Sequence, residues 1–374
     1  MAECAQRYSQ RTKQLWISLN WYLIISIWNE YSQVRCNRVK SFSQSSLSRF
    51  LFEVNYEDIS TKFTRNERDE FKIEWEKVQE YRKLNAGKMK HKNSNRDKRK
   101  QNKVCHGKFP HYCLDGKSRK GVVSEETGRT EIDLTIFNPD TDKVLAQKTL
   151  PDKEGEAVAA EELIKNISSS IPEGIFTGDA GITSPRVTSI IQENKHHYIL
   201  AVKGNAGKIY TQIRNFNWDS VTTAHVQISE GHGRREIRKL KKMSLSQLEG
   251  AEYKKYSGAK FAYKTDTKVN HIKDDKLVFE ERYFIADEEI GDLSLPQVAN
   301  YIRNHWAQES YHWVKDVILN EDNCPQKTPN GSRVLSTIRS QVYTLGKKVC
   351  GSVKEFTNRF VSKPEVFLGK HEKK

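Results

Sequence analysis

Hydrophobic and polar positions alternate along the central part of the chain, as they do in strands. Residues 131–137 place Ile, Leu and Ile at every second position, and 144–150 continue in the same style. Because side chains of a strand point to opposite faces in turn, this alternation predicts two half-buried strands. Short apolar runs predict three further buried strands, which end in polar or glycine-rich turns: Tyr112–Leu114 before Asp115-Gly116-Lys117, residues 174–181 with Asp179 at the strand end, and residues 198–202 before Lys203.

Helical spacing separates these strands. Residues 156–167 read as a helix, and so do residues 184–194, where Ser184 is a candidate N-cap and Pro185 stands at the first helical position. Strand, helix and strand over 174–202 form a βαβ unit, and open α/β sheets place their sites at the ends of such strands.

Residues 300–323 contain no Pro or Gly and predict a helix of several turns. At about 100° per residue, two stripes lie side by side on it. The apolar stripe comprises Ile302, Trp306, Trp313 and Val317. The polar stripe comprises His305, Glu309, His312 and Asp316. A polar stripe at the rim of a core is a place where protonation and metal affinity can be tuned.

The pattern predicts an α/β fold with an RNase H-like mixed sheet and flanking helices, interrupted by a β-rich insertion, plus a small helical N-terminal region. Strands at 221–228, 260–265 and 276–286 define that insertion. The expected segments are a helical region at 1–62 that could serve as a DNA-binding accessory, a charged helix and basic linker at 63–104, the first part of the core at 105–205, the insertion at 206–295, the second part of the core at 296–348, and a basic, loosely held tail at 349–374.

Charge favours a polyanionic partner. The 374 residues carry 63 Lys and Arg against 48 Asp and Glu, a net charge of +15, so nucleic acid is favoured over a membrane surface. Residues 86–103 hold eight basic residues and one acid. This segment is either a plain solvated linker or a strap that follows DNA phosphates.

Cysteine usage and hydropathy bear on location. The six cysteines are scattered and contain no CxxC pair, which predicts reduced thiols in a cytoplasmic protein. The apolar stretch at 16–28 is too short to span a bilayer and is flanked unlike a signal peptide, so a buried helix is expected there and no membrane partner.

Three carboxylates stand where chemistry is expected: Asp115 and Asp179 after strands, and Glu309 on the helix. If the fold brings them together, they require a cation between them. Oxygen ligands of this kind suit Mg²⁺ or Mn²⁺. Two ions about 4 Å apart would activate an attacking water or 3′-hydroxyl in phosphodiester chemistry.

The chain resembles the ISAs1 family of insertion-sequence transposases, a branch of the DDE enzymes related to the IS4 group. The matching motifs run in order from about residue 110 to 348: LDGKSRKG, TDKVLAQKTLPDKEGEAVAAEELI, GIFTGDAG, YILAVKGNAGKI, EGHGRREIR, ERYFIAD and HWAQESYHWVKDVILNED. The sequence departs from the IS4 signature at Asp316, where relatives have Lys, and in having Arg303 as the nearest arginine before Glu309.

The resemblance implies an RNase H-like core with Asp115, Asp179 and Glu309 as the DDE triad and metal ligands for two Mg²⁺ or Mn²⁺ ions. It implies binding of terminal inverted repeats and target DNA, a dimer on DNA, and a nucleoid-associated location. Candidate DNA-binding residues are Lys117, Lys203, His232, Arg234 and Arg238. His305 and His312 are expected to support the metal ligands or to pack beside them. For Trp306 and Trp313, packing in the core is favoured over stacking on DNA bases.

Three alternatives stay open. The first is a metal-dependent nuclease on the same core that joins no strands. The second is a catalytically dead, transposase-derived DNA-binding protein. The third is a zinc or iron enzyme built on Glu309 and His312.

Overall fold

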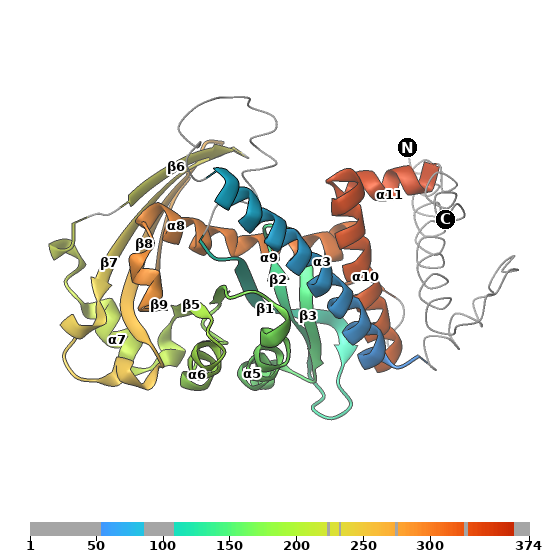
Figure 1. The fold of residues 1–374 in the computed structure, drawn as a ribbon, viewed down its shortest axis with the longest axis horizontal. Coiled ribbons are helices and arrows are strands. Elements are labelled where there is room, and N and C mark those ends of the chain that lie inside the picture. The colour runs from blue at the N-terminus through green and yellow to red at the C-terminus, as the bar shows by residue number, and fades with distance from the viewer. Residues whose placement is uncertain are drawn as a thin grey trace, which may run out of the picture. The chain divides into compact units, whose positions relative to one another are not determined.

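The computed structural model describes residues 54–85, 108–222, 225–231, 233–273, 276–324 and 328–362 (Figure 1). They fall into two compact units. The larger comprises Thr64–Ser118 and Glu125–Ser310, and the smaller comprises the chain up to Phe63, Arg119–Ser124 and the chain from Tyr311. The predictions for residues 1–53, the basic linker at 86–103, His232 and the chain from 363 lie outside the described residues.

Nine strands of the described residues form one mixed sheet in the order β3-β2-β1-β4-β5-β9-β8-β7-β6. The strands are β1 His111–Val123, β2 Thr130–Asn138, β3 Lys143–Leu150, β4 Ile175–Gly178, β5 His197–Val202, β6 His225–Gly231, β7 Arg234–Ser244, β8 Ala259–His271 and β9 Lys276–Asp287. The helices are α3 Tyr56–Asn85, α5 Glu156–Ile167, α6 Pro185–Glu193, α7 Lys208–Asn215, α8 Leu295–Asn304, α9 Trp306–Trp313, α10 Pro329–Cys350 and α11 Val353–Ser362. The predicted mixed α/β fold is confirmed, and the order of β1 to β5 is consistent with an RNase H-like core.

Strand directions separate the core from the insertion. Strand β4 runs parallel to β1 and to β5, with α6 as the crossover, which confirms the predicted βαβ unit. Strands β6 to β9 form an antiparallel meander, and β9 pairs antiparallel with β5. The β-rich insertion therefore extends the same sheet.

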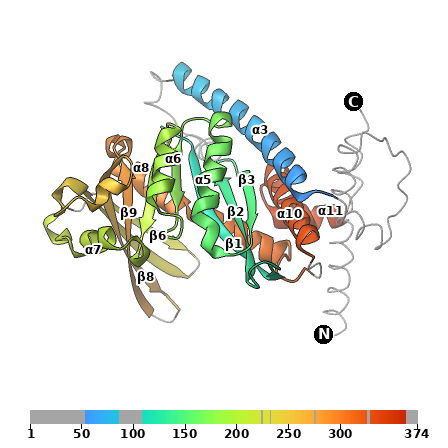
Figure 2. The same ribbon diagram turned by 90° about the horizontal axis from the view of Figure 1, so that it is seen from below.

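The central strands β4 and β5 are packed on both faces. Phe176 and Leu200 belong to a core with residues of α5 and α6, which lie side by side on one face (Figure 2). Ile175 and Ile199, one position away in each strand, belong to a second core with Val298 of α8. Because successive strand residues face opposite sides, the fully apolar runs of β4 and β5 cover both faces.

Local signals set the helix starts. The Ser184 hydroxyl accepts a hydrogen bond from the Val187 N–H, and Pro185 occupies the first turn of α6, as predicted. Helix α8 begins with a capping box between Ser294 and Gln297. In the described residues no helix has the length and apolar character needed to cross a bilayer.

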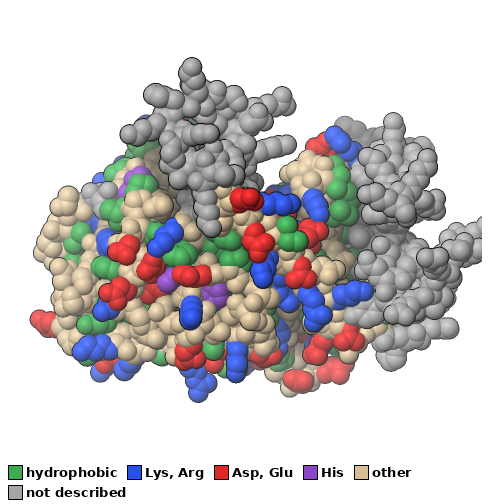
Figure 3. All heavy atoms as spheres, in the orientation of Figure 1, with side chains coloured by type: hydrophobic (Ala, Val, Ile, Leu, Met, Phe, Trp, Pro, Cys, Tyr) green, Lys and Arg blue, Asp and Glu red, His purple; other side chains and the backbone are tan. Residues whose placement is uncertain are grey.

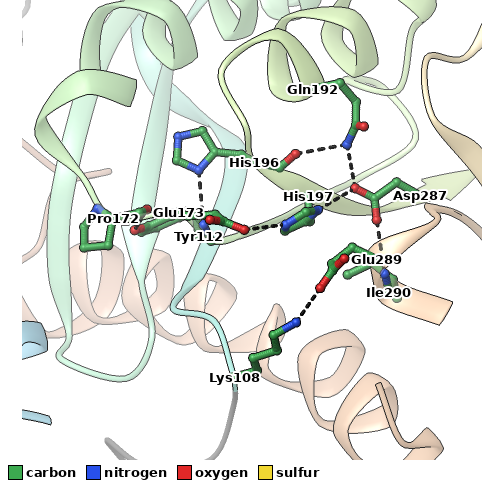
Figure 4. A network of polar contacts seen from close by, with 11 residues as sticks. Lys108, Tyr112, Pro172, Glu173, Gln192, His196, His197, Asp287, Glu289 and Ile290 are labelled. Atoms are coloured by element: carbon green, nitrogen blue, oxygen red, sulfur yellow. Dashed lines mark hydrogen bonds and ion pairs between the residues drawn. The ribbon is translucent and has the colours of Figure 1, made fainter. Parts of the chain in front are cut away.

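A polar network fastens the end of β9 to the core (Figure 4). His197 lies between Asp287, 3.0 Å from Nδ1, and Glu173, 2.9 Å from Nε2. Burial lowers the pKa of His197, but the hydrogen bonds with Asp287 and Glu173 outweigh that effect and raise it. Gln192 of α6 also donates to Asp287 at 2.5 Å. Asp287 of the insertion thus contacts His197 of β5 and Gln192 of α6, in addition to the pairing of β9 with β5.

The smaller unit contains a buried ion pair beside α10. Lys315, 1% exposed, lies 3.2 Å from a Glu321 carboxylate oxygen and donates to the Ser336 hydroxyl at 2.7 Å. Tyr311 and Ser340 share a hydrogen bond of 2.7 Å. Helix α11 occupies residues that the sequence assigned to a loosely held tail.

Two sequence predictions are wrong in detail. The strand at Tyr112–Leu114 does not end at Asp115, because β1 continues to Val123. The helix expected over 300–323 is interrupted at His305 and becomes a π-helix at Val314–Ile318. Each irregularity shifts the phase of the helix, so no single apolar stripe runs through it, and Trp313 and Val317 are each 56% exposed.

Candidate functional site

The parallel register of β1 and β4 places two of the predicted carboxylates next to each other. Leu114 is paired with Gly178, and Asp115 and Asp179 follow directly on each strand. Neighbouring strands are about 4.8 Å apart, so the two side chains start from adjacent positions. The Asp179 Oδ1 accepts hydrogen bonds from the N–H groups of Gly181 (2.9 Å) and Ile182 (3.3 Å), which fix its orientation.

The third carboxylate, Glu309, is held by its neighbours on α8 and α9. The Gln308 amide is fully buried and donates to the Thr135 hydroxyl at 2.7 Å and to the Thr135 carbonyl at 3.1 Å. His305 Nδ1 lies 2.9 Å from the Thr177 hydroxyl, two residues before Asp179. These contacts pin the start of α9 to β2 and β4 and present Glu309 in its first turn.

Two imidazole rings contact the hydroxyl of Thr177, which precedes Asp179 by two residues. One is His305, and the other is His111, whose Nε2 lies 2.8 Å from that hydroxyl. Burial lowers the pKa of His111 well below its usual value and that of His305 to about 4. Both imidazoles are therefore uncharged at neutral pH, and His305 contacts the strand that carries Asp179. His312 lies in the smaller unit, where its ring is 5.3 Å from that of Tyr311.

Asp115, Asp179 and Glu309 line one cavity of about 280 Å³. Burial and the nearby charges of Asp179, Glu156 and Glu309 raise the pKa of Asp115 to about 7, although the Gly116 N–H, which donates to its Oδ1 at 2.9 Å, opposes the shift. A carboxyl group this crowded by negative charge favours a proton or a cation.

Sequence reasoning missed a fourth carboxylate at this place. Glu156 begins α5 and is 4% exposed. Burial and the charge of Asp179 raise its pKa, whereas Lys153 lowers it. The helical pattern of 156–167 shows a Glu in the first turn, a position where an acid stabilises a helix, so the sequence carries no signal that this one points inward.

The lining of the cavity also includes basic and aromatic side chains. It includes Lys203 and Arg238, as predicted for the DNA-binding set, and also Arg282, Arg303 and Trp306. The guanidinium groups of Arg238 and Arg282 lie 5.3 Å and 4.9 Å from the centre of the half-buried Trp306 ring. Cations at this distance are attracted to the face of an indole.

Glu236 organises this cluster. Its carboxylate pairs with Arg238, with Arg234 at 2.7 Å and with Arg303 at 3.7 Å. Burial, followed by the charges of Arg303, Arg234 and Arg282, lowers the pKa of Arg238 to about 10. Arg282 pairs instead with Glu280 at 2.7 Å. Four arginines thus share two acids, so a further anion would be stabilised here.

The other predicted DNA-binding residues lie elsewhere. Lys117 is buried and donates to the Ser118 carbonyl at 3.4 Å, and Arg234 has a half-exposed side chain. Neither is among the described residues that line the cavity.

The donor set fits a hard divalent cation in its chemistry. The groups are carboxylate oxygens, which suit Mg²⁺ or Mn²⁺, and one of them, Glu156, is buried without a hydrogen bond or ion pair in the described part of the chain. Within the same residues, no three His, Cys, Asp or Glu side chains converge closely enough to hold an ion as they stand.

Comparison with known proteins gives three findings. The chain is 28% identical over 259 residues to "Putative transposase YncI" of Escherichia coli O157:H7, covering 65% of this chain and 64% of that protein. It is 27% identical over 241 residues to "H repeat-associated putative transposase YhhI" of Escherichia coli K12, covering 61% of each. The matches thus span less than two thirds of these relatives. A piggyBac transposase synaptic complex with hairpin DNA is similar at a TM-score of 0.38 and 12% identity, over 74% of this chain and 58% of that chain.

The match to a family model includes three of the four carboxylates described above. Residues 132–345, more than half of the chain, match the family described as "Transposase DDE domain". The matched segment contains Asp179, Glu309 and Glu156, and Asp115 lies just before it. The protein belongs to the transposase DDE domain family.

Proposed function

We propose that this protein is a DDE transposase of the ISAs1 group, related to IS4, that cuts the ends of a mobile element and joins them to target DNA. The observation that carries the proposal is the cavity lined both by the carboxylates of Asp115, Asp179 and Glu309 and by several arginines. Acidic groups suit the divalent cations of phosphodiester chemistry, and arginines suit the phosphates of the substrate.

In this proposal Asp115, Asp179 and Glu309 hold Mg²⁺ or Mn²⁺. Such ions, when bound, activate a water or 3′-hydroxyl for attack and stabilise the leaving oxygen. Thr177 with His305, and Thr135 with Gln308, keep the carboxylates in register with one another. Burial lowers the pKa of both His305 and His111, so these uncharged imidazoles position neighbouring groups through hydrogen bonds and add no positive charge beside the carboxylates.

The arginines that line the cavity, Arg238, Arg282 and Arg303, would hold the DNA strand. Arg238 and Arg282 are fixed against Trp306, and Lys203 stands at the mouth of β5. Guanidinium groups bind phosphate oxygens in pairs, so these side chains would set the position of the scissile phosphate over the carboxylates. Arg234, outside the cavity lining, and His232 are also proposed to contact DNA, whereas the buried Lys117 is not available for a phosphate contact as it stands. Two copies would bring two element ends together.

The test is nicking of a supercoiled plasmid that carries the genomic segment encoding this chain with its flanks. The wild-type protein should nick it only with Mg²⁺ or Mn²⁺, and Asp179→Asn and Glu309→Gln should each lose nicking while still binding DNA. The control is Asp219→Asn, which removes one charge at a fully exposed side chain. Nicking that survives in both site variants would refute the assignment.

The products distinguish the alternatives. Joined strands indicate a transposase, whereas cleavage without joined products indicates a nuclease on the same core. Metal-independent DNA binding without nicking would indicate a catalytically dead DNA-binding protein. Tightly held zinc or iron in the purified protein would instead support an enzyme built on Glu309 and His312.

A further inference from the structure

The carboxylate of Glu156 is directed into the cluster formed by Asp115 and Asp179. A Cβ atom placed on Gly181 would lie 3.2 Å from Asp179 Oδ1 and 3.3 Å from Glu156 Oε2. One small volume above the Gly181 backbone is therefore bordered by oxygens of both residues. The absence of a side chain at Gly181 is what lets the two carboxylates approach each other.

The other oxygen of Glu156 lies against Gly116, the residue next to Asp115. A Cβ on Gly116 would overlap Glu156 Oε1 and would stand 3.1 Å from its Cδ. Two glycines thus make room for the same glutamate. Gly116 follows Asp115 directly, and Gly181 comes two residues after Asp179.

This arrangement is unfavourable for the fold alone. Glu156 is 4% exposed, and its carboxylate makes no hydrogen bond or ion pair in the described residues, with Lys153 acting on it only through its charge. Placing an unpartnered carboxylate beside two others costs free energy through desolvation and repulsion. A bound cation offsets both costs, because it is attracted to every carboxylate in the group.

We propose that Glu156 is a fourth carboxylate ligand of the divalent-cation site, acting together with Asp115 and Asp179. The inference rests on the proposed metal-dependent function and adds a residue to it. Mg²⁺ takes about six oxygen ligands in octahedral geometry, and Glu156 would supply one from the first turn of α5, on a different element from the other three acids. Its position at the helix start fixes it independently of α9.

The test measures Mn²⁺ binding by the DNA-free protein, using the electron paramagnetic resonance signal of free Mn²⁺, together with thermal unfolding with and without Mn²⁺. Glu156→Gln keeps the shape and removes the charge, and Glu156→Asp keeps the charge and shortens its reach. Glu162→Gln is the matched control, since it removes an exposed acid from the same helix. Asp179→Asn reports loss of the proposed site itself.

We expect Glu156→Gln to weaken Mn²⁺ binding at least about tenfold, since the loss of even an outer-shell partner costs ten- to a hundredfold. Without metal it should unfold at the same temperature as wild type or higher, because one repelling charge is gone. Glu156→Asp should also bind more weakly, and Glu162→Gln should match wild type.

Each contrary result has a distinct meaning. If Asp179→Asn loses Mn²⁺ and Glu156→Gln binds within twofold of wild type, the role of Glu156 is refuted and the proposed function stands. A metal-free Glu156→Gln protein that unfolds well below wild type would also refute the inference, because it would show a structural role. If wild type itself binds no Mn²⁺, the proposed metal chemistry and the inference both fail.

Discussion

Replacing Asp115 by Asn should stabilise the metal-free protein. The carboxylate lies beside Asp179, Glu156 and Glu309, and together with burial they raise its pKa from 3.8 to about 7. Asn has the same shape, keeps an oxygen that can accept the Gly116 N–H, and carries no charge. The substitution therefore removes repulsion and desolvation and leaves the local hydrogen bond in place.

The size of this stabilisation and its dependence on pH follow from the pKa shift of Asp115. The folded state keeps the Asp115 proton up to about pH 7, whereas the unfolded chain releases it near pH 3.8. The folded state thus binds more protons between these values, so the free energy of unfolding of wild type falls as the pH rises through this window. About three pKa units at 1.36 kcal/mol each correspond to about 4 kcal/mol above pH 7, and screening by solvent at this half-buried group lowers the expectation to about 2–4 kcal/mol.

Thermal unfolding in EDTA at several pH values between 5 and 8 measures this difference. At about 2–4 °C per kcal/mol, Asp115→Asn should unfold at least about 4 °C above wild type at pH 8. The gap should be less than half as large at pH 5, where wild type holds the proton. Mg²⁺ should narrow the gap by stabilising wild type alone.

The exposed-site variant Asp219→Asn serves as control and should show no gap at any pH. If Asp115→Asn unfolds at or below the wild-type temperature at pH 8 without metal, the carboxylates are not crowded in solution. The electrostatic argument for a cation at this place would then be wrong.

Three further outcomes are expected. His197→Gln should unfold at a lower temperature than wild type at pH 6, and this difference should shrink toward pH 9. The raised pKa of His197 gives stability that is complete below about pH 6.5 and is lost as the pH rises through the folded-state pKa. A difference in unfolding temperature that does not depend on pH would contradict this. Lys315→Met should cost about 3–5 kcal/mol in urea unfolding, since it removes a buried cation from beside the buried carboxylate of Glu321, and adding Glu321→Gln should recover most of the loss; equal stability of the single and double variants would exclude the ion pair as the cause. Gln308→Leu should lower plasmid nicking without lowering DNA binding, because Gln308 holds the turn that presents Glu309, and nicking at the wild-type rate would show that this anchor is dispensable.

The sequence by itself determined most elements of the half of the sheet formed by β1 to β5. Alternation over 131–137 and 144–150 corresponds to β2 and β3, the periodicity of 156–167 corresponds to α5, and Ser184-Pro185 marks the start of α6. These signals are local, because each depends on which face of one element is buried or on one capping hydrogen bond.

The sequence failed where neighbours outweigh local pattern. Strand β7 was not predicted, because its segment RREIRKLKKMS is mostly charged and only Glu236, Leu240 and Met243 are buried. Its pairing with β6 and β8 along its length forms the strand. In the same way, the interruption at His305 and the π-helix at 314–318 are set by packing and side-chain contacts that no periodicity reveals.

Sequence motifs also predicted Asp115, Asp179 and Glu309 as the site carboxylates, and strand register explains why the first two are adjacent. Only the tertiary structure decided that the carboxylate of Glu156 lies near Asp179 and that Arg282 and Arg303 line the same cavity. A glutamate in the first turn of a helix and an arginine in a strand have the same local pattern whether they point to solvent or to a site. Which of these holds depends on the glycines, strands and charges that the fold brings beside them, and those come from distant parts of the chain.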